Sequence, residues 1–289
     1  MYIVTLLSAP GALDAALVES LRNAWGGGDA IWLSPDEAAE FAIGTLPSNQ
    51  WDVWKSVQDQ SVDLIAQPAN GRRKKMLLAD MDSTMIQQEC IDELAAEARI
   101  GERVADITAR AMNGELDFEA ALDERVGLLA GLPESVIQKV IEERITFMPG
   151  GATLLATMKA NGAHAALVSG GFTAFTGYVA DALGFDENRA NTLLIEDGKL
   201  TGKAGRPILG KQAKVDALKE ITARLGISET DVLAVGDGAN DLGMLNRAGT
   251  GVALHAKPSV QEQCQVRVNH GDLTALLFLQ GYSRSEFVG

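Results

Sequence analysis

Two aspartates stand at the end of an apolar run, in the stretch KKMLLADMDSTMI at residues 74–86. Met76 to Ala79 are predicted to form a buried strand, and Asp80 and Asp82 follow it two positions apart. Because alternate residues of an extended chain project to the same side, both carboxylates should lie together beyond the carboxyl end of that strand. Two like charges so close repel each other, so we expect a divalent cation or a shared proton at this site.

These two acids suit phosphoryl transfer through an aspartyl-phosphate. Asp80 would be the nucleophilic carboxylate, which divides the transfer into two easier steps. Asp82 would act as general acid on the leaving oxygen and then as general base on water, provided that the neighbouring charge raises its pKa. Asp237, in the stretch GDGAND, follows another predicted strand and would complete an oxygen-ligand site for Mg²⁺.

A transferring phosphoryl group also needs hydrogen-bond donors and a positive charge. Ser169 and the pair Gly170-Gly171 are predicted to lie where a strand turns into a helix, so that a hydroxyl and unobstructed backbone N–H groups would face an anion. Lys214, in KQAKVDAL, is the candidate cation, although spacing alone does not choose between it and nearby lysines such as Lys211.

The elements that position these residues follow from the pattern of apolar runs. From Lys75 onward, predicted strands alternate with predicted helices, which indicates parallel βαβ units in a Rossmann-like α/β fold at residues 71–289. Residues 87–147 are helical in pattern without a convincing strand, so we expect a helical cap inserted after the first strand, above the site. Asp197-Gly198, between apolar runs, predicts a hairpin.

The first 70 residues are predicted to form a separate small α+β domain. Strand-like and helical runs alternate there, at Ile3 to Leu7, Leu13 to Trp25, Ala30 to Leu33 and Val62 to Ala66, with shorter pieces between them. The polar segment Gln67 to Lys75 is predicted to be a linker, with a domain boundary near Ala69.

Composition excludes several classes of partner. The chain has 289 residues, is 46% hydrophobic and carries a formal charge of −14, which repels both nucleic acid and anionic membranes. We find neither an apolar run of about 20 residues nor the basic start of a secretory signal, so we expect a cytoplasmic protein that acts on a small molecule. Cys90 and Cys264 are too far apart for a metal-ligand spacing and are expected in the core.

Taken in order, DMDST, SGG, the downstream Lys and GDGAND resemble the four motifs of the haloacid dehalogenase superfamily of Mg²⁺-dependent phosphotransferases. The stretches QQECIDELAAEA, MNGELDFEAALDERVGLL, LVSGGF and AVGDGANDLGML are similar to its phosphoserine phosphatase family in particular. The resemblance covers about residues 75–271. It implies hydrolysis of O-phospho-L-serine to serine and phosphate, the last step of serine biosynthesis.

The resemblance implies a role for each matching position. Asp80 would be the nucleophile and Asp82 the acid/base, with Mg²⁺ held by the Asp80 side chain, the Asp82 backbone carbonyl and the Asp237 side chain. Asn240 and Asp241 would support the phosphate and the metal. Phosphate-binding positions would be Ser169, Gly170 and Lys214.

The predicted cap supplies the remaining positions. Glu89 and Arg125 match the pair that reads the amino acid part of phosphoserine. A free amino acid head group carries one ammonium and one carboxylate, so one anion and one cation suit it. Met112 and Phe118 match apolar positions that would close the pocket against water.

Several alternatives stay open at this point. The substrate could be another small phosphomonoester such as homoserine phosphate, or the phosphoryl group could pass to a second alcohol. Dehalogenation would leave Asp82 and the metal site without a role, and a phosphate-accepting receiver would leave Glu89 and Arg125 unexplained. The unit at residues 1–70 weakly resembles the ACT-like regulatory modules of amino acid enzymes. The alternative is a packing module or a dimerisation module, and only the dimerisation module implies a homodimer.

Overall fold

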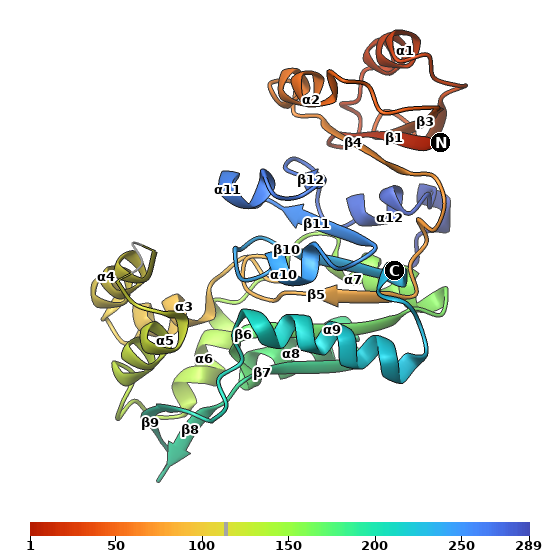
Figure 1. Ribbon diagram of the computed structural model, residues 1–289. Helices are drawn as coiled ribbons and strands as arrows, with labels where there is room; N and C mark the ends of the chain where they lie inside the picture. Colours follow the sequence, from red (N-terminus) through yellow and green to blue (C-terminus); the bar gives the residue numbers. More distant parts are fainter. Residues whose placement is uncertain (113–114) are drawn as a thin grey trace.

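The computed structural model describes residues 1–112 and 115–289, and its main domain is built on a parallel sheet (Figure 1). The strand order is β12-β11-β10-β5-β6-β7, with every neighbouring pair parallel. The strands are β5 (Met76–Ala79), β6 (His164–Phe172), β7 (Glu187–Asn191), β10 (Val232–Gly236), β11 (Thr250–Leu254) and β12 (Val266–Val268). The predicted Rossmann-like sheet is confirmed.

Helices cover both faces of this sheet, and the strand residues alternate between two cores. On β5, Leu77 and Ala79 pack into one core, whereas Met76 and Leu78 pack into the other. Both faces are therefore apolar, as expected for parallel strands. The helices of this domain are α7 (Gly151–Ala160), α8 (Thr173–Leu183), α9 (Lys211–Leu225), α10 (Leu242–Leu245), α11 (Pro258–Gln261), α12 (Ala275–Leu279) and the short 3₁₀ turns η1 (Glu229–Asp231) and η2 (Arg284–Glu286). Within the described ranges, every helix is too short or too polar to cross a bilayer.

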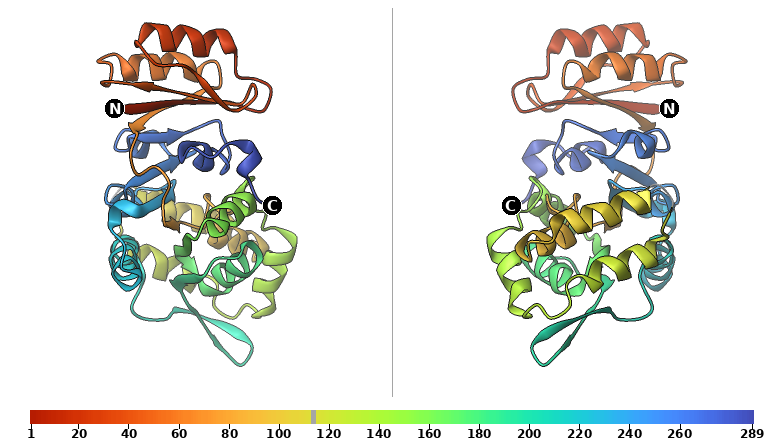
Figure 2. Two further views of the ribbon diagram at one scale, coloured as in Figure 1. Left: turned by 90° about the vertical axis from the view of Figure 1, so that its right-hand side faces the viewer. Right: turned by 90° about the vertical axis from the view of Figure 1, so that its left-hand side faces the viewer.

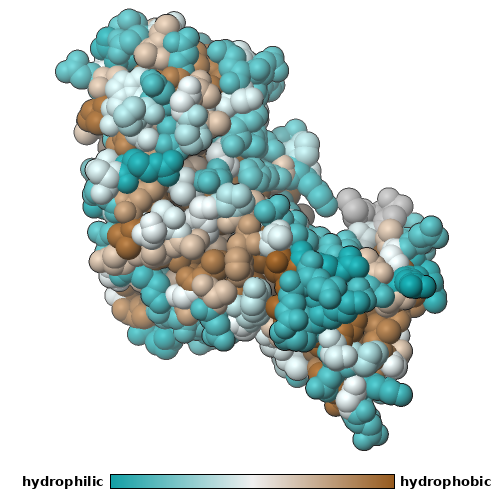
Figure 3. Space-filling model, turned by 180° about the vertical axis from the view of Figure 1, so that it is seen from behind, coloured by the Kyte–Doolittle hydropathy of each residue, from teal (hydrophilic) through white to brown (hydrophobic). Residues whose placement is uncertain are grey.

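The predicted helical cap is confirmed and stands beyond the carboxyl ends of the strands (Figure 1). Its two connections to the main domain run side by side, because Gln87 N–H donates to Thr146 O at 3.0 Å and Met148 N–H donates to Met85 O at 2.9 Å. Seen from behind, the cap is a lobe with a largely hydrophilic outer surface (Figure 3). Its helices are α3 (Cys90–Glu97), α4 (Gly101–Met112), α5 (Phe118–Gly127) and α6 (Ser135–Glu143).

A hairpin of β8 (Leu193–Glu196) and β9 (Lys199–Ala204) extends from the main domain along the cap (Figure 2). Its turn is the predicted pair, Asp197-Gly198, and both residues have positive φ, 51° and 71°. Gly131 N–H of the cap donates to Leu200 O at 2.8 Å, so the hairpin is tied to the cap by backbone hydrogen bonds.

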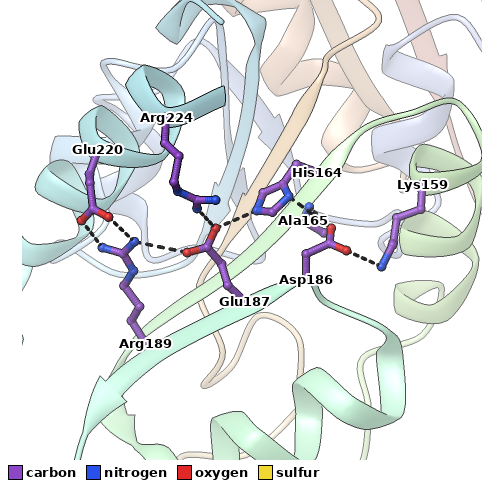
Figure 4. Close-up of polar contacts among 8 residues, drawn as sticks. All are labelled: Lys159, His164, Ala165, Asp186, Glu187, Arg189, Glu220 and Arg224. Atoms are coloured by element: carbon purple, nitrogen blue, oxygen red, sulfur yellow. Dashed lines mark hydrogen bonds and ion pairs between the residues drawn. The ribbon is translucent and has the colours of Figure 1, made fainter. Parts of the chain in front are cut away.

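A chain of polar contacts lies at the other end of the sheet, where β6 and β7 begin (Figure 4). Glu187 accepts from His164 at 2.7 Å and from Arg189 at 3.2 Å, and Arg224 of α9 reaches the same carboxylate. Arg189 also makes two hydrogen bonds to Glu220 of α9, at 2.6 and 2.9 Å. These polar contacts tie β7 to α9 at the end of the sheet that lies away from the acidic residues.

The N-terminal residues form an antiparallel sheet of their own, in the order β2-β3-β1-β4, with two helices on its outer face (Figure 2). The strands alternate with helices as βαββαβ and enclose a separate hydrophobic core. Its elements are β1 (Tyr2–Leu7), α1 (Ala15–Ala24), β2 (Ile31–Ser34), β3 (Ala38–Ile43), α2 (Gln50–Gln58) and β4 (Asp63–Pro68). The sequence pattern between Leu33 and Val62 predicts only short pieces of unspecified type, and these are β3 and α2.

Asp63 joins this sheet to the main domain. Its side chain is fully buried and accepts three backbone hydrogen bonds from the segment after β12: from Asn269 N–H at 2.8 Å, His270 N–H at 3.0 Å and Gly271 N–H at 2.8 Å. The predicted linker is also held in place, since Arg72 makes a two-pronged ion pair with Glu40 of β3 at 2.7 and 3.1 Å. The two parts therefore meet through buried hydrogen bonds and an ion pair, beside apolar residues of the N-terminal sheet such as Leu7 and Ile65 that join the core of the main domain.

Replacing Asp63 by Ala should lower the free energy of unfolding by about 3 kcal/mol, because three buried N–H groups lose a charged acceptor. The change can be followed by urea unfolding of the full chain. Asp29→Ala, at an exposed loop position, is the matched control and should shift the midpoint little. Equal midpoints for both variants would show that Asp63 contributes nothing to the contact.

Candidate active site

Asp80 and Asp82 follow β5 at its carboxyl end, as the sequence predicts. The residue between them, Met81, is fully buried in the core, whereas Asp82 is partly accessible, so the alternation of an extended chain continues past the strand. Asp80 N–H donates to Val235 O of β10 at 3.0 Å, which carries the sheet hydrogen bonding one residue beyond β5. The nucleophile candidate thus stands on a rigid element.

Lys214 lies against Asp80 in the first turns of α9. Its Nζ is 2.7 Å from Asp80 Oδ1 and 2.5 Å from Asp241 Oδ1, and its side chain is 1% exposed. Burial opposes its charge, but the two carboxylates outweigh burial and raise the pKa of Lys214. Among the lysines that the sequence left open, the structure brings Lys214 into contact with the acidic strand end.

Asp82 is held by hydrogen bonds from two other elements. Its Oδ1 accepts from Cys90 N–H, at the start of α3, at 2.9 Å, and its Oδ2 accepts from Ser169 Oγ at 3.3 Å. Burial raises the pKa of Asp82, and the hydrogen bonds from Cys90 oppose that rise. The direction is the predicted one, but the main cause is burial and not the charge of the neighbouring Asp80.

Asp237 follows β10 and completes a cluster of acids with Asp80 and Asp241, whose carboxylate oxygens lie within 4.8 Å of one another. Burial and the charge of Asp241 raise the pKa of Asp237 to about 6. Burial, again with the charge of Asp241, also raises the pKa of Asp80 well above its usual range, despite Lys214. Three clustered carboxylates share one ammonium, and this excess of negative charge fits a divalent cation with oxygen ligands.

Asp241 has both oxygens engaged by the protein. One pairs with Lys214, and the other accepts from Gly238 N–H at 3.0 Å. Gly236 makes this close approach feasible, because a Cβ there would lie 2.4 Å from Asp241 Cγ. Asn240, in the same loop, is half-buried. The GDGAND loop is therefore folded around Asp241, and Asp237 is left with the freer carboxylate.

The SGGF segment differs from the prediction in one respect. It does not turn into a helix after Ser169; β6 continues through Phe172, with an irregular pairing to β7, and α8 begins at Thr173. Ser169 Oγ accepts from Gly171 N–H at 2.8 Å, so the hydroxyl and the glycine backbone form a tight loop beside Asp82. The donors lie on an irregular strand end because the strand hydrogen bonding persists past the glycines.

Gly171→Ala should lower kcat by about 10²-fold, because the new Cβ would stand 2.6 Å from Asp82 Oδ2 and displace this candidate acid/base. Steady-state turnover checks this effect. Gly177→Ala, in α8, is the control, since a Cβ there meets no heavy atom within 4 Å. Unchanged kcat in Gly171→Ala would mean that the position of Asp82 does not limit the reaction.

Glu89 and Arg125 lie on the cap side of the site. Ser83 Oγ donates to Glu89 Oε1 at 2.7 Å, and Ser83 itself has a positive φ of 54°. Glu89 is exposed as a whole residue, but other atoms pack around its carboxyl group. This local burial and the negative charge of Asp82 disfavour the charged form and raise the pKa of Glu89 to about 7. Burial lowers the pKa of Arg125, while the charges of Asp92 and Glu89 oppose that shift.

Phe118, the first residue of α5, bridges the cap and the main domain. A Cβ at Gly170 would lie 3.2 Å from Phe118 Cζ, and one at Gly210 would lie 3.2 Å from Phe118 Cδ1, so the ring packs on two glycine positions. The backbone of Met112 ends α4, but its side chain lies outside the described part of the chain.

Cys90 contributes a hydrogen bond to the site that the sequence does not indicate. The predicted burial of Cys90 is confirmed, since its exposure is 1%. Its backbone N–H also holds Asp82. A cysteine at the start of a helix carries no signal for this role, because the donor is a backbone group that any residue except proline supplies.

Comparison with known proteins identifies the family. Residues 77–246, which include every acid of the cluster, match the haloacid dehalogenase-like hydrolase family. The chain belongs to this family. The haloacid dehalogenase-like relatives include the phosphoserine phosphatase of Haemophilus influenzae, 45% identical over 82% of this chain and 76% of that protein.

Two solved structures extend the likeness. A family hydrolase from Salmonella enterica serovar Typhi has a TM-score of 0.88 at 31% identity and covers 96% of this chain and 98% of its own, so the N-terminal domain is included. A phospho-aspartyl intermediate analogue of phosphoserine phosphatase has a TM-score of 0.66 at 41% identity, covering 71% of this chain and 98% of its own.

Proposed function

We propose that this protein hydrolyses O-phospho-L-serine to serine and phosphate through an aspartyl-phosphate on Asp80. The observation that carries the proposal is the arrangement at the strand ends: a buried Asp80 paired with Lys214, beside the hydrogen-bonded acid Asp82, under a cap that brings Glu89 and Arg125. The relative from Haemophilus influenzae, named phosphoserine phosphatase, and the solved phospho-aspartyl analogue support it.

In the first step, a carboxylate oxygen of Asp80 attacks phosphorus and the bond from phosphorus to the serine oxygen breaks. Asp82 gives its proton to that leaving oxygen, a task that suits a carboxyl whose pKa is raised by burial. Lys214, 2.7 Å from Asp80, and the donors of Ser169 and Gly170 would offset the charge on the phosphoryl oxygens.

In the second step, water attacks the same phosphorus while Asp82, now a carboxylate, accepts a water proton. The bond between Asp80 and phosphorus breaks, phosphate leaves, and both aspartates return to their starting states. The hydrogen bonds from Cys90 and Ser169 keep Asp82 oriented through both steps. One residue thus serves in turn as acid and base.

We further propose Mg²⁺ as the cofactor. Asp80 and Asp237 would hold it with the Asp82 backbone carbonyl, while Asp241, whose oxygens are engaged by Lys214 and Gly238, would support the site. Bound there, the ion would offset the clustered negative charge and polarise the phosphoryl oxygens. Oxygen-only donors suit this hard cation.

For the amino acid part of the substrate, we propose that Arg125 binds the carboxylate and Glu89 the ammonium. An ammonium beside Glu89 would favour its charged form, which its present surroundings disfavour. Phe118 would close the pocket over the ester from the cap side. We assign residues 71–289 to the phosphatase domain and residues 1–70 to a separate module.

Arg125→Ala should lower kcat/KM for phosphoserine by about 100-fold, the effect of losing a charge-assisted, two-pronged contact. Its kcat/KM for p-nitrophenyl phosphate, which has no amino acid group, should change little. Arg103→Ala, exposed on α4, is the control variant. A parallel loss on both esters would contradict the assignment, since Arg125 would then act on the phosphoryl group or on folding.

The proposed function is tested by phosphate release from O-phospho-L-serine with Mg²⁺, in competition with O-phosphohomoserine, O-phosphothreonine and p-nitrophenyl phosphate. We expect phosphoserine to have the highest kcat/KM of the four. Preference for O-phosphohomoserine would keep the chemistry and replace the substrate. Absence of phosphate release from all four would overturn the proposal.

A further inference from the structure

Asn191, the last residue of β7, is a buried amide whose hydrogen bonds all go to the backbone of two other segments. Asn191 is buried, with an exposure of 2%. Asn191 Nδ2 donates to Gly170 O at 2.8 Å and to Leu209 O at 3.2 Å, and Asn191 Oδ1 accepts from Leu209 N–H at 2.7 Å. Both the nitrogen and the oxygen of the side-chain amide therefore make hydrogen bonds.

The two segments that Asn191 joins both lead into the active site. Gly170 is next to Ser169, which contacts Asp82. Leu209 precedes Gly210, the residue that caps α9, and Lys214 is the fourth residue of that helix. Asn191 thus sets the spacing between the serine-glycine donors and the helix that carries the buried lysine.

Asn191 also closes the base of the β8–β9 hairpin. The chain leaves the main domain after Asn191 and returns at Leu209, and a second pair of residues is joined there, since Gly205 N–H donates to Thr192 O at 2.7 Å. The hairpin itself is tied to the cap.

From the cap side, Phe118 packs on Gly170, whose carbonyl accepts from Asn191, and on Gly210, which follows Leu209. The cap residue and the buried amide therefore hold the same two segments from different sides. A displaced Gly170 or Gly210 would alter the surface on which Phe118 packs. This places Asn191 where it affects both the phosphoryl site and the docking of the cap.

We propose that Asn191 is a positioning residue of the phosphoryl site, which keeps Ser169 and Gly170 in register with Lys214. The proposal rests on the proposed function. Alanine would leave the Gly170 and Leu209 groups without their partner. Aspartate has the same shape but would present only acceptors to two carbonyl oxygens, so it should be at least as damaging as alanine.

The test compares Asn191→Ala and Asn191→Asp with Thr176→Val in the full chain. Thr176 is a matched control, because it is fully buried and its hydroxyl bonds to Asn188, also on β7, at 2.9 Å. The readouts are kcat and KM for phosphoserine and p-nitrophenyl phosphate, the inhibition constant of inorganic phosphate, and the melting temperature.

We expect both Asn191 variants to lose about 10- to 100-fold in kcat/KM, by the same factor for the two esters, and to bind inorganic phosphate more weakly. Thr176→Val should lower the melting temperature without changing phosphate binding. If the Asn191 variants keep wild-type phosphate inhibition and kcat/KM while melting earlier, Asn191 is only structural and the proposal fails.

Failure of the proposed function has a different signature. If only the substrate is wrong, wild-type protein would cleave p-nitrophenyl phosphate but not phosphoserine, and the Asn191 comparison would still be read from p-nitrophenyl phosphate and inorganic phosphate. If no ester is cleaved, binding of inorganic phosphate measured by calorimetry still compares the Asn191 variants with the wild type. A loss in Asn191→Ala confined to phosphoserine would overturn the positioning role, because the amide contacts the phosphoryl side of the site and not Glu89 or Arg125.

Discussion

Asp80→Asn should reduce kcat for phosphoserine by about 10⁴-fold, because the amide cannot form the acyl-phosphate through which the reaction proceeds. The variant should still fold. Burial and the neighbouring Asp241 disfavour the charged form of Asp80 and raise its pKa, so a neutral amide removes an unfavourable charge in metal-free protein. We therefore expect a melting temperature at or above that of the wild type in EDTA. Phosphate release and calorimetry measure the two effects.

Asp29→Asn, at an exposed position, changes the net charge by the same amount and should keep full activity. Turnover in Asp80→Asn within tenfold of the wild type would exclude Asp80 as nucleophile. A markedly lower melting temperature would instead attribute the lost activity to folding, since Asn at this site would then have disturbed the pairing with Lys214.

Removal of divalent cations should have the second largest effect. With EDTA we expect turnover to fall by more than about 10³-fold and to return on addition of Mg²⁺, because the phosphoryl group must approach a strongly anionic cluster. Mg²⁺ should also stabilise the fold, by about 2.7 kcal/mol at 100 times its dissociation constant. The melting temperature is therefore a readout that does not depend on activity.

Asp237→Asn is the variant that locates the ion. Losing the freer carboxylate of the cluster should abolish most of the stabilisation by Mg²⁺, whereas Asp29→Asn should retain it. An equal rise in melting temperature with Mg²⁺ in wild type and Asp237→Asn would place the stabilising ion elsewhere.

The sheet and the acidic strand ends were predictable because their signals are local. Met76 to Ala79 is a continuous apolar run, as a strand buried on both faces requires, and the acids follow it directly. The cap was predictable because α3 to α6 come from one uninterrupted stretch of helical periodicity. In each case the determining residues are neighbours in the sequence.

Other features depend on contacts between distant segments. The strand β3 has the sequence AAEFAI, whose alanines favour a helix, and it becomes a strand because it pairs with β1 and β2. In the sequence, Asp63 and Asn191 resemble ordinary polar residues at strand ends. Their roles depend on hydrogen-bond partners that lie more than 200 residues from Asp63 and about 20 residues from Asn191. The lysine that accompanies Asp80 was identified by resemblance and not by spacing.

The most direct test of the central claim is to trap the covalent intermediate. Wild-type protein is mixed with phosphoserine and Mg²⁺, quenched in acid within milliseconds, digested and examined by mass spectrometry. The account predicts one added phosphoryl group on the peptide that contains Asp80, absent when Asp80→Asn is treated in the same way. Phosphate released by wild-type protein with no phosphorylated peptide, or with the phosphoryl group on another residue, would contradict it.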